Sequence, residues 1–325
     1  MPDGARTFLG PGASAPKTRL PGRLVHAQST TALPRPSRSS PTAPGDVRNV
    51  SLAASEARAG PHQNGGMLIL LPPSEKKTRP SEVGAAALDL EAMSLPQLCE
   101  ARKTMLRAAQ RTAAGTDAAE RLGVPASAPE LVGRMLHLEQ EPAAAPLAVY
   151  SGVLYDQLEA GQAPVEGRDV LIQSALFGLV DAFRDRIPAY RLSAGSTLSR
   201  LGKAGSWWGR QLRPLAQELR AEQAESGSPL MIDCRSGGYR SMMAMRSGDG
   251  VRVLEVAPVQ ERDGVRKVIS HEAKRYRGLV TRVLLGLERA PATADEVVDA
   301  LGSGLGAGLE VELDGDRLVV VDRVG

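Results

Sequence analysis

Basic side chains surround a glycine in one predicted helix near the end of the chain. Residues 271–289 carry apolar side chains at helical spacing, and Lys274, Gly278 and Arg282 fall on the opposite side, flanked by His271, Arg275 and Arg277. Glycine costs a helix about 1 kcal/mol relative to alanine. Close approach of a phosphate backbone or of another chain segment would explain its presence. The pattern predicts either a phosphate-binding face or an ordinary solvated basic face.

A second group of polar residues follows the first predicted strand. Residues 67–71 form a short apolar run, and the loop after it carries Ser74 and Lys77. Ligands of open α/β sheets gather outside the carboxyl ends of the strands, so this loop is a candidate edge of a site. It lacks the glycine spacing of a phosphate-binding loop, and its side chains would have to act directly. A solvated turn with two exposed lysines explains the spacing equally well.

Two further segments offer donors of the kind that bind phosphate. Ser236 and Tyr239 follow the strand predicted at 230–233, and Tyr190 with Arg191 follows a second short apolar pair. Trp208 beside another tryptophan could stack on bases, but the chain has only ten aromatic residues. We therefore expect Trp208 to pack in the core.

Other chemistries find little support in the sequence. The four histidines, His26, His62, His137 and His271, have no partners at metal-ligand spacing, so we expect neither a metal site nor a bound cofactor. No nucleophile elbow or pair of catalytic acids is present, and a catalytic residue cannot be assigned. Cys99 and Cys234 are the only cysteines, which favours small core residues in a reducing cytoplasm over a disulfide framework. No apolar run is long enough to span a membrane.

The elements that must position these residues alternate between strand and helix. Strands are predicted at 67–71, 170–172 and 230–233, and hairpins at 251–269 and 309–321 turn through Asp-Gly sequences. This pattern predicts an α/β fold of mixed α+β type, in which helices pack on a mixed sheet.

Capping signatures locate the helices between these strands. Ser94 is the predicted N-cap of a helix that ends near Ala113, and Thr293 caps a later one. Two further capping pairs predict a helical hairpin over 117–140. An apolar face that includes Trp208 defines another helix, which Pro214 could shorten or bend.

The first 66 residues differ in composition from the rest. They hold eight Lys or Arg against three acids, a net charge of +5, which leaves about −2 for residues 67–325 out of +3 overall. The high isoelectric point therefore comes from these residues and is no evidence that the folded part binds nucleic acid. Residues 1–66 are rich in Pro, Ser, Thr, Ala and Gly, which predicts a disordered leader before a single domain. Either this leader is translated, or synthesis begins at Met67, which we favour.

Beyond these patterns, residues 67–325 resemble the peroxide-stress protein YaaA family. The resemblance is carried by strings whose order and spacing are together specific: MLILLPPSEKKT at 67–78, YSGVLYD at 150–156, SALFGLV at 174–180, IPAYRL at 187–192, WG at 208–209, DCRSGGY at 233–239 and ISHEAKRYRGLVTR at 269–282. The chain departs from the usual pattern at Lys76, where glycine is common, and at Asp181 and Ala182, where an Arg-Pro pair is common.

The resemblance implies a cytoplasmic protein of the hydroperoxide response that binds DNA without an established reaction. Binding would use a basic cleft and a helix-hairpin-helix element, which the hairpin near residues 122–127 would supply. Because that hairpin lacks a Gly-x-Gly sequence, its backbone is a weak phosphate ligand. The DNA- and phosphate-binding set implied by the resemblance is Ser74, Lys77, Tyr190, Arg191, Ser236, Tyr239, Lys274, Arg277 and Arg282.

Three hypotheses follow for the function. The first is a DNA-binding stress protein that limits iron-driven damage, with binding largely independent of sequence. The second is an enzyme that acts on a phosphorylated small molecule or nucleotide through the same basic cleft. The third is a scaffold whose basic helix docks an acidic protein.

Overall fold

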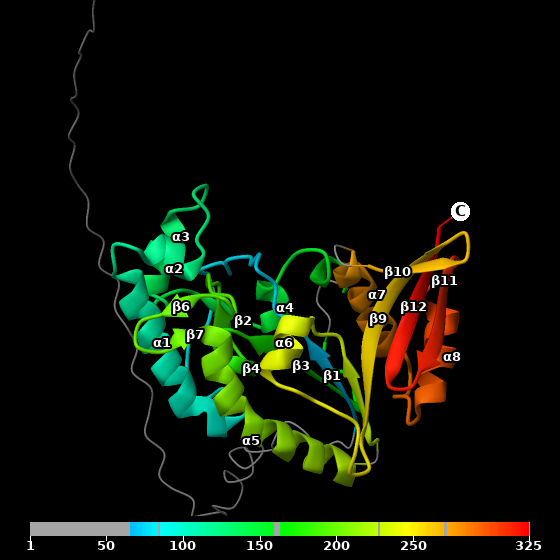
Figure 1. The fold of residues 1–325 in the computed structure, drawn as a ribbon. Helices are drawn as coiled ribbons and strands as arrows, with labels where there is room; N and C mark the ends of the chain where they lie inside the picture. Colours follow the sequence, from blue (N-terminus) through cyan, green and yellow to red (C-terminus); the bar gives the residue numbers. More distant parts are fainter. Residues whose placement is uncertain (1–65, 84, 159–162, 227, 270–271, 325) are drawn as a thin grey trace, which may run out of the picture. The chain divides into compact units, whose positions relative to one another are not determined.

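A computed structural model describes residues 66–83, 85–158, 163–226, 228–269 and 272–324, all within one compact unit that spans Ala54–Gly325 (Figure 1). Its main sheet has eight strands in the order β11-β12-β9-β8-β1-β3-β4, with β10 paired to β9. The strands are β1 (Met67–Leu71), β3 (Arg168–Ser174), β4 (Gly178–Asp181), β8 (Leu230–Asp233), β9 (Arg252–Arg262), β10 (Val265–Val268), β11 (Leu309–Asp314) and β12 (Arg317–Arg323). Two short pairs, β2 (Ala143–Ala144) with β5 (Ile187–Pro188) and β6 (Thr197–Leu198) with β7 (Gly202–Lys203), lie outside it.

The centre of the sheet is parallel, which brings three strand ends to one edge. β1 pairs in parallel with β3 on one side and β8 on the other, so that Leu71 lies beside Ile172 and Leu70 beside Asp233. All five residues of β1 are fully buried, as expected for a strand covered on both faces. Polar residues that follow β1, β3 and β8 are therefore neighbours in space.

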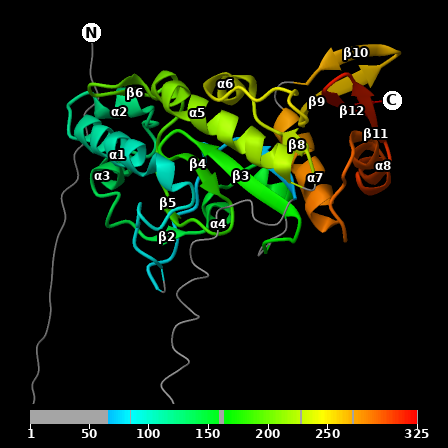
Figure 2. The same ribbon diagram turned by 90° about the horizontal axis from the view of Figure 1, so that it is seen from below.

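Helices cover both faces of the sheet. They are α1 (Cys99–Ala113), α2 (Ala118–Leu122), α3 (Glu130–Leu136), α4 (Pro146–Val149), α5 (Ala204–Glu225), α6 (Gly237–Met242), α7 (Ala273–Gly286) and α8 (Ala294–Gly304), with 3₁₀ turns η2 (Pro96–Leu98) and η3 (Tyr155–Gln157). Figure 2 shows α5 on one side of β3 and β8, and α7 on the other. The predicted mixed α/β fold is confirmed.

Most predicted elements are present. The strand at 230–233 has the predicted bounds, both Asp-Gly hairpins form, and the Thr293 hydroxyl accepts a hydrogen bond from the Glu296 amide at the start of α8. Trp208 is fully buried, and its indole donates to the Ala175 carbonyl at 2.8 Å. Pro214 lies inside α5 without ending it, because the 22-residue helix continues on both sides.

The predicted cap at Ser94 is wrong. The chain turns at Leu95, which has a left-handed backbone (φ 59°), and a 3₁₀ turn over 96–98 precedes α1. The physical reason is Arg102, a fully buried residue. Its guanidinium donates hydrogen bonds to several backbone carbonyls, among them those of Ser94 and Phe177 at 2.7 and 3.1 Å. The pairs around Asp117 and Ser127 also form no side-chain cap, although α2 and α3 do form the predicted hairpin.

Two sequence predictions fall on residues that the structure does not describe. Apart from Gly66, the predicted disordered leader is outside the described ranges, and so is His271. Among the helices that are described, none combines the length and the apolar character needed to cross a membrane.

Candidate functional site

The loop after β1 is held against the segment that follows α4. Lys77 and Tyr150 form an antiparallel bridge, the Thr78 amide donates to the Val149 carbonyl at 2.8 Å, and the Ser74 hydroxyl donates to the Ser151 carbonyl. These bonds hold the backbone of the loop in place, and so they fix the direction in which the Lys77 side chain extends from it. The predicted site edge is thus an ordered loop and not a free turn.

The Lys77 amine lies against aromatic rings. It donates to the Ser74 carbonyl at 2.6 Å, and its nitrogen lies 4.1 Å from the centre of the Tyr190 ring and 5.3 Å from that of Tyr150. Among the described residues no carboxylate forms an ion pair with it. Burial lowers the pKa of the Lys77 ammonium to about 7; Arg191 adds to this effect and Glu75 opposes it. Near neutral pH the Lys77 amine is therefore partly uncharged.

A chain of hydroxyl groups runs beside this amine. The Tyr190 hydroxyl shares hydrogen bonds of 2.8 Å with the hydroxyls of Tyr150 and Ser174, the last residue of β3. Burial raises the pKa of Tyr150 and Tyr190 well above the usual range, so both stay neutral at physiological pH. Tyr239 lies close enough to interact with both rings, and burial raises its pKa to about 12.

Arg191 connects the helical hairpin to this loop. Its guanidinium donates to the Gly123 carbonyl at 2.7 Å and lies 3.5 Å from the Glu75 carboxylate. A cavity of about 460 Å³ opens here; it is lined by Glu75, Lys76, Lys77, Pro125, Leu131, Arg134, Ala189, Tyr190 and Arg191. The structure thus brings the first loop, residues 189–191 and the hairpin together around one cavity.

A second polar cluster lies at the end of β8. Arg235 is fully buried and forms a bidentate pair with Asp233 at 2.7 and 2.9 Å, while it also donates to the Gln173 side chain. Arg240 of α6 approaches the same carboxylate at 3.9 Å. The Cys234 sulfur lies 3.6 Å from the Thr281 hydroxyl of α7, and burial raises its thiol pKa to about 12, so it is protonated.

Arg277 is the one residue of the predicted α7 set that faces this cluster. Its guanidinium interacts electrostatically with Cys234 and Asp233, and burial lowers its pKa. Lys274 and Arg282 are exposed, and no hydrogen bond or ion pair in the described ranges joins either to Lys77. Ser236 precedes α6 and is not among the residues that line the cavity. That these residues share a groove with Lys77 stays a prediction.

Gly278 permits the approach of another chain segment. A Cβ at this position would lie 2.3 Å from the Leu154 carbonyl oxygen and 2.8 Å from the Gln157 side chain. The side of α7 that carries Gly278 therefore packs on η3, and Gly278 is buried. Of the two explanations left open by the sequence, the packing of another segment accounts for this glycine.

Several polar residues of the site lie outside the set that the resemblance implied, although the strings that carry the resemblance contain all of them except Arg134. Tyr150, Ser174 and Arg134 line or adjoin the cavity, and Asp233 and Arg235 form the second cluster. Ser174 and Asp233 are the last residues of parallel strands, a position that sequence patterns could have marked. Arg134 gave no such signal, because an arginine on a short helix is common on protein surfaces.

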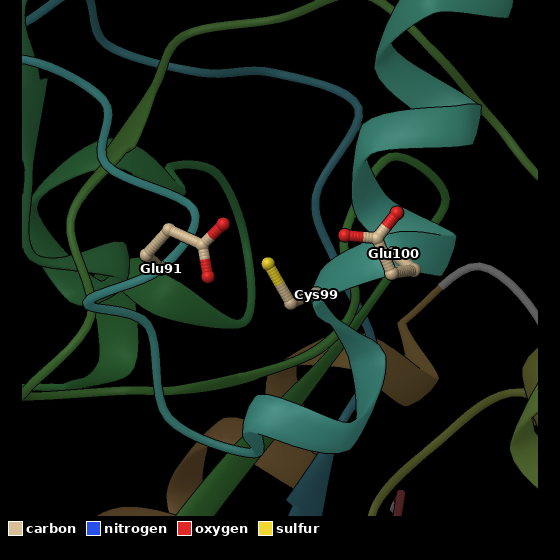
Figure 3. A group of neighbouring side chains, drawn as sticks. All are labelled: Glu91, Cys99 and Glu100. Carbon is tan, nitrogen blue, oxygen red and sulfur yellow. The ribbon is translucent and has the colours of Figure 1, made fainter.

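One group of potential metal ligands lies elsewhere, on α1 and the segment before it. Figure 3 shows Glu91, Cys99 and Glu100, whose ligand atoms lie within 4.8 Å of one another. The Lys103 ammonium pairs with both carboxylates, at 2.5 and 2.8 Å, and so already offsets half of their combined charge. Burial raises the pKa of the Cys99 thiol, which disfavours the thiolate that a metal would need.

The fold and the site define an α/β protein with a partly basic cavity at the carboxyl edge of its parallel strands. Residues 67–301 match the family described as peroxide stress protein YaaA, and the chain belongs to that family. It is 38% identical over 259 residues to a UPF0246 protein of Corynebacterium efficiens, which covers 77% of this chain and 97% of that protein. UPF0246 proteins of Corynebacterium glutamicum and Streptomyces coelicolor are 36% and 33% identical, over 76% of this chain and 95% and 93% of theirs.

Proposed function

We propose that this member of the peroxide-stress family acts in the cytoplasm as a DNA-binding protein that limits iron-driven oxidative damage. The observation that carries the proposal is the shared cavity, into which three separate segments bring Lys76, Arg134 and Arg191 around a single carboxylate, Glu75. Arginine and lysine side chains are the usual ligands of DNA phosphates. The excess of cations at this one place contrasts with the negative net charge of residues 67–325.

The contacts with phosphate would come from side chains. In the hairpin the amides of Gly123 and Val124 already donate to α2 carbonyls at 3.1 and 2.7 Å, so they are not free to bind an anion. Arg134 and Lys76 have no carboxylate partner within the described ranges, and both line the cavity. Side-chain contacts to the DNA backbone carry no sequence information, which supports sequence-independent binding.

Fluorescence anisotropy with the full-length chain and a labelled duplex tests this proposal. We expect binding at low salt that weakens steeply at moderate salt. Arg134→Glu should weaken binding by about tenfold, because it reverses a charge at the cavity. The matched control is Arg317→Glu on β12, toward the other end of the sheet, where the arginine is exposed.

Because all variants keep residues 1–66, any binding by those basic residues is the same in each and cancels in the comparison. No binding by the full-length chain at low salt would end the proposal. Equal losses in Arg134→Glu and Arg317→Glu would place the DNA somewhere other than the cavity.

The size of the cavity favours a second function. A volume of about 460 Å³ suits a small molecule, and Lys77 and Tyr190 are among the residues that line it. An enzyme that acts on a phosphorylated small molecule or nucleotide would use the same cations to hold phosphate. Thermal denaturation with a panel of nucleotides and sugar phosphates tests it, because a ligand present at 100 times its Kd stabilises the fold by about 2.7 kcal/mol.

A further inference from the structure

We propose that Lys77 is a nucleophile that condenses with the aldehyde of a phosphorylated sugar bound in the cavity beside Arg134 and Arg191. This inference rests on the proposed function, and it specifies what the cavity recognises. Two sources share the chemistry: the open-chain deoxyribose at a site in DNA that has lost its base, and a free sugar phosphate. Oxidative attack on DNA produces the first, so we favour an abasic strand.

The geometry around the amine leaves its nitrogen available. Among the described residues only the Ser74 carbonyl accepts a hydrogen bond from Lys77, and Glu75, whose charge acts on the amine, pairs with Arg191 instead. The hydroxyls of Tyr150 and Tyr190 bond to each other and not to the amine. A lysine kept free of carboxylates in a water-poor pocket is the usual form of an amine that attacks carbonyl groups.

The surroundings also supply what the substrate needs. Arg134, Arg191 and Lys76 line the same cavity as the amine, so a phosphate held by them would bring an attached sugar next to Lys77. Tyr190 also lines the cavity, and its buried ring packs against the Lys77 ammonium. The hydroxyl of Ser174, a fully buried residue, forms a hydrogen bond with the Tyr190 hydroxyl and so helps to fix this ring.

The reaction balances without an oxidant or a reductant. The lone pair of the neutral Lys77 amine attacks the aldehyde carbon to give a carbinolamine. The carbon–oxygen bond then breaks, and the oxygen leaves as water. Both protons of that water come from the nitrogen, one on forming the carbinolamine and one on its loss of water. The product is an imine between Lys77 and the sugar, which water can hydrolyse again.

Trapping with sodium cyanoborohydride tests the proposal, because hydride reduces the imine to a stable secondary amine. The full-length protein is mixed with a duplex that holds one abasic site, or with ribose 5-phosphate, and adducts are read by intact mass. A duplex with tetrahydrofuran in place of the abasic sugar is the negative control, since it has no aldehyde. We expect an adduct with the abasic duplex and none with the tetrahydrofuran duplex.

Two variants and peptide mapping identify the amine. Lys77→Arg keeps a positive charge but loses the nucleophile, so the adduct should be lost. Lys203→Arg, at an exposed lysine that does not line the cavity, should keep it. Circular dichroism and the thermal midpoint check that Lys77→Arg is folded. Peptide mapping of the wild-type adduct gives an answer even if that variant unfolds, and modification of surface lysines in place of Lys77 would overturn the proposal.

The pH dependence gives a further readout. Adduct yield should rise through about pH 7 and then level off, because the pKa of Lys77 is lowered by its burial. The charged groups that face the amine are Arg191 and Glu75, and the neutral hydroxyls of Tyr150 and Tyr190 adjoin it. A yield that continues to rise through pH 9 would indicate an ordinary solvated lysine and contradict the proposal.

The outcomes separate this inference from the proposed function. DNA binding without any adduct would refute the reactive lysine and leave DNA binding intact. An adduct at Lys77 with ribose 5-phosphate, combined with no DNA binding, would support the reactive lysine and refute the DNA-binding function.

Discussion

The lowered pKa of Lys77 predicts a specific dependence of stability on pH. A lysine side chain normally has a pKa of 10.5, whereas that of Lys77 in the folded protein is about 7. Between these two values the unfolded chain binds a proton that the folded protein does not. The free energy of unfolding therefore rises with pH across this window, by about 1.4 kcal/mol per pH unit from this group. Below pH 7 Lys77 is protonated in both the folded and the unfolded state, so the free energy of unfolding is lowered by the full cost of burying the charge.

Replacing Lys77 by methionine removes this dependence while it keeps much of the side-chain volume. We expect Lys77→Met to be more stable than the wild type at pH 7, and the difference should shrink by about 4 kcal/mol by pH 10. Urea unfolding followed by fluorescence of the buried Trp207 and Trp208 measures both proteins at each pH. Other titrating groups are common to both proteins and cancel.

Lys76→Met is the control, because Lys76 is exposed in the same loop. We expect its stability to follow that of the wild type at every pH. If the difference between Lys77→Met and the wild type stays constant from pH 7 to 10, then the Lys77 ammonium is not desolvated and the reasoning fails.

Three further predictions concern the packing that positions the site. Gly278→Ala should destabilise the fold by about 1–3 kcal/mol, because the new Cβ would meet the Leu154 carbonyl. Gly302→Ala in α8, where a Cβ meets nothing within 4 Å, should instead stabilise the fold by up to about 1 kcal/mol. The midpoints of urea unfolding test both variants. Asp233→Asn should lower the free energy of unfolding by about 3–5 kcal/mol, since it leaves the charge of the fully buried Arg235 without a partner carboxylate. A thermal midpoint close to that of the wild type would contradict the importance of this buried ion pair. Thr293→Ala should cost about 1 kcal/mol through loss of the cap at the start of α8, and a change within error in urea unfolding would argue against that cap.

The strands and the long helices were predictable because each follows one dominant pattern. The run at 67–71 is apolar throughout because it is covered on both faces, and the Asp-Gly turns fix the two hairpins. The start of α1 was not predictable, since the chain there is organised by Arg102. The carbonyls that bind this side chain come from residues as distant as Leu179. No local pattern contains that information.

The candidate site was predictable in its residue types more than in its arrangement. Lys77, Tyr190 and Arg191 meet at one cavity because the loop after β1 and residues 187–192 pack together. The Lys77 amine is enclosed in part by Tyr150. A backbone bridge between these two residues places Tyr150 beside the amine, and no sequence pattern shows that bridge. Gly278 was noticed as unusual, but only the structure shows that η3 approaches it.

The salt dependence of DNA binding tests most directly whether the cations around this cavity contact phosphate. The measurement is the slope of log affinity against log salt for the full-length wild type and for the double variant Lys76→Gln/Arg134→Gln. We predict weaker binding by the variant and a slope shallower by about 1.8, which corresponds to two lost phosphate contacts. Parallel lines for the two proteins would show that neither side chain contacts DNA, and would contradict the proposed role of the cavity.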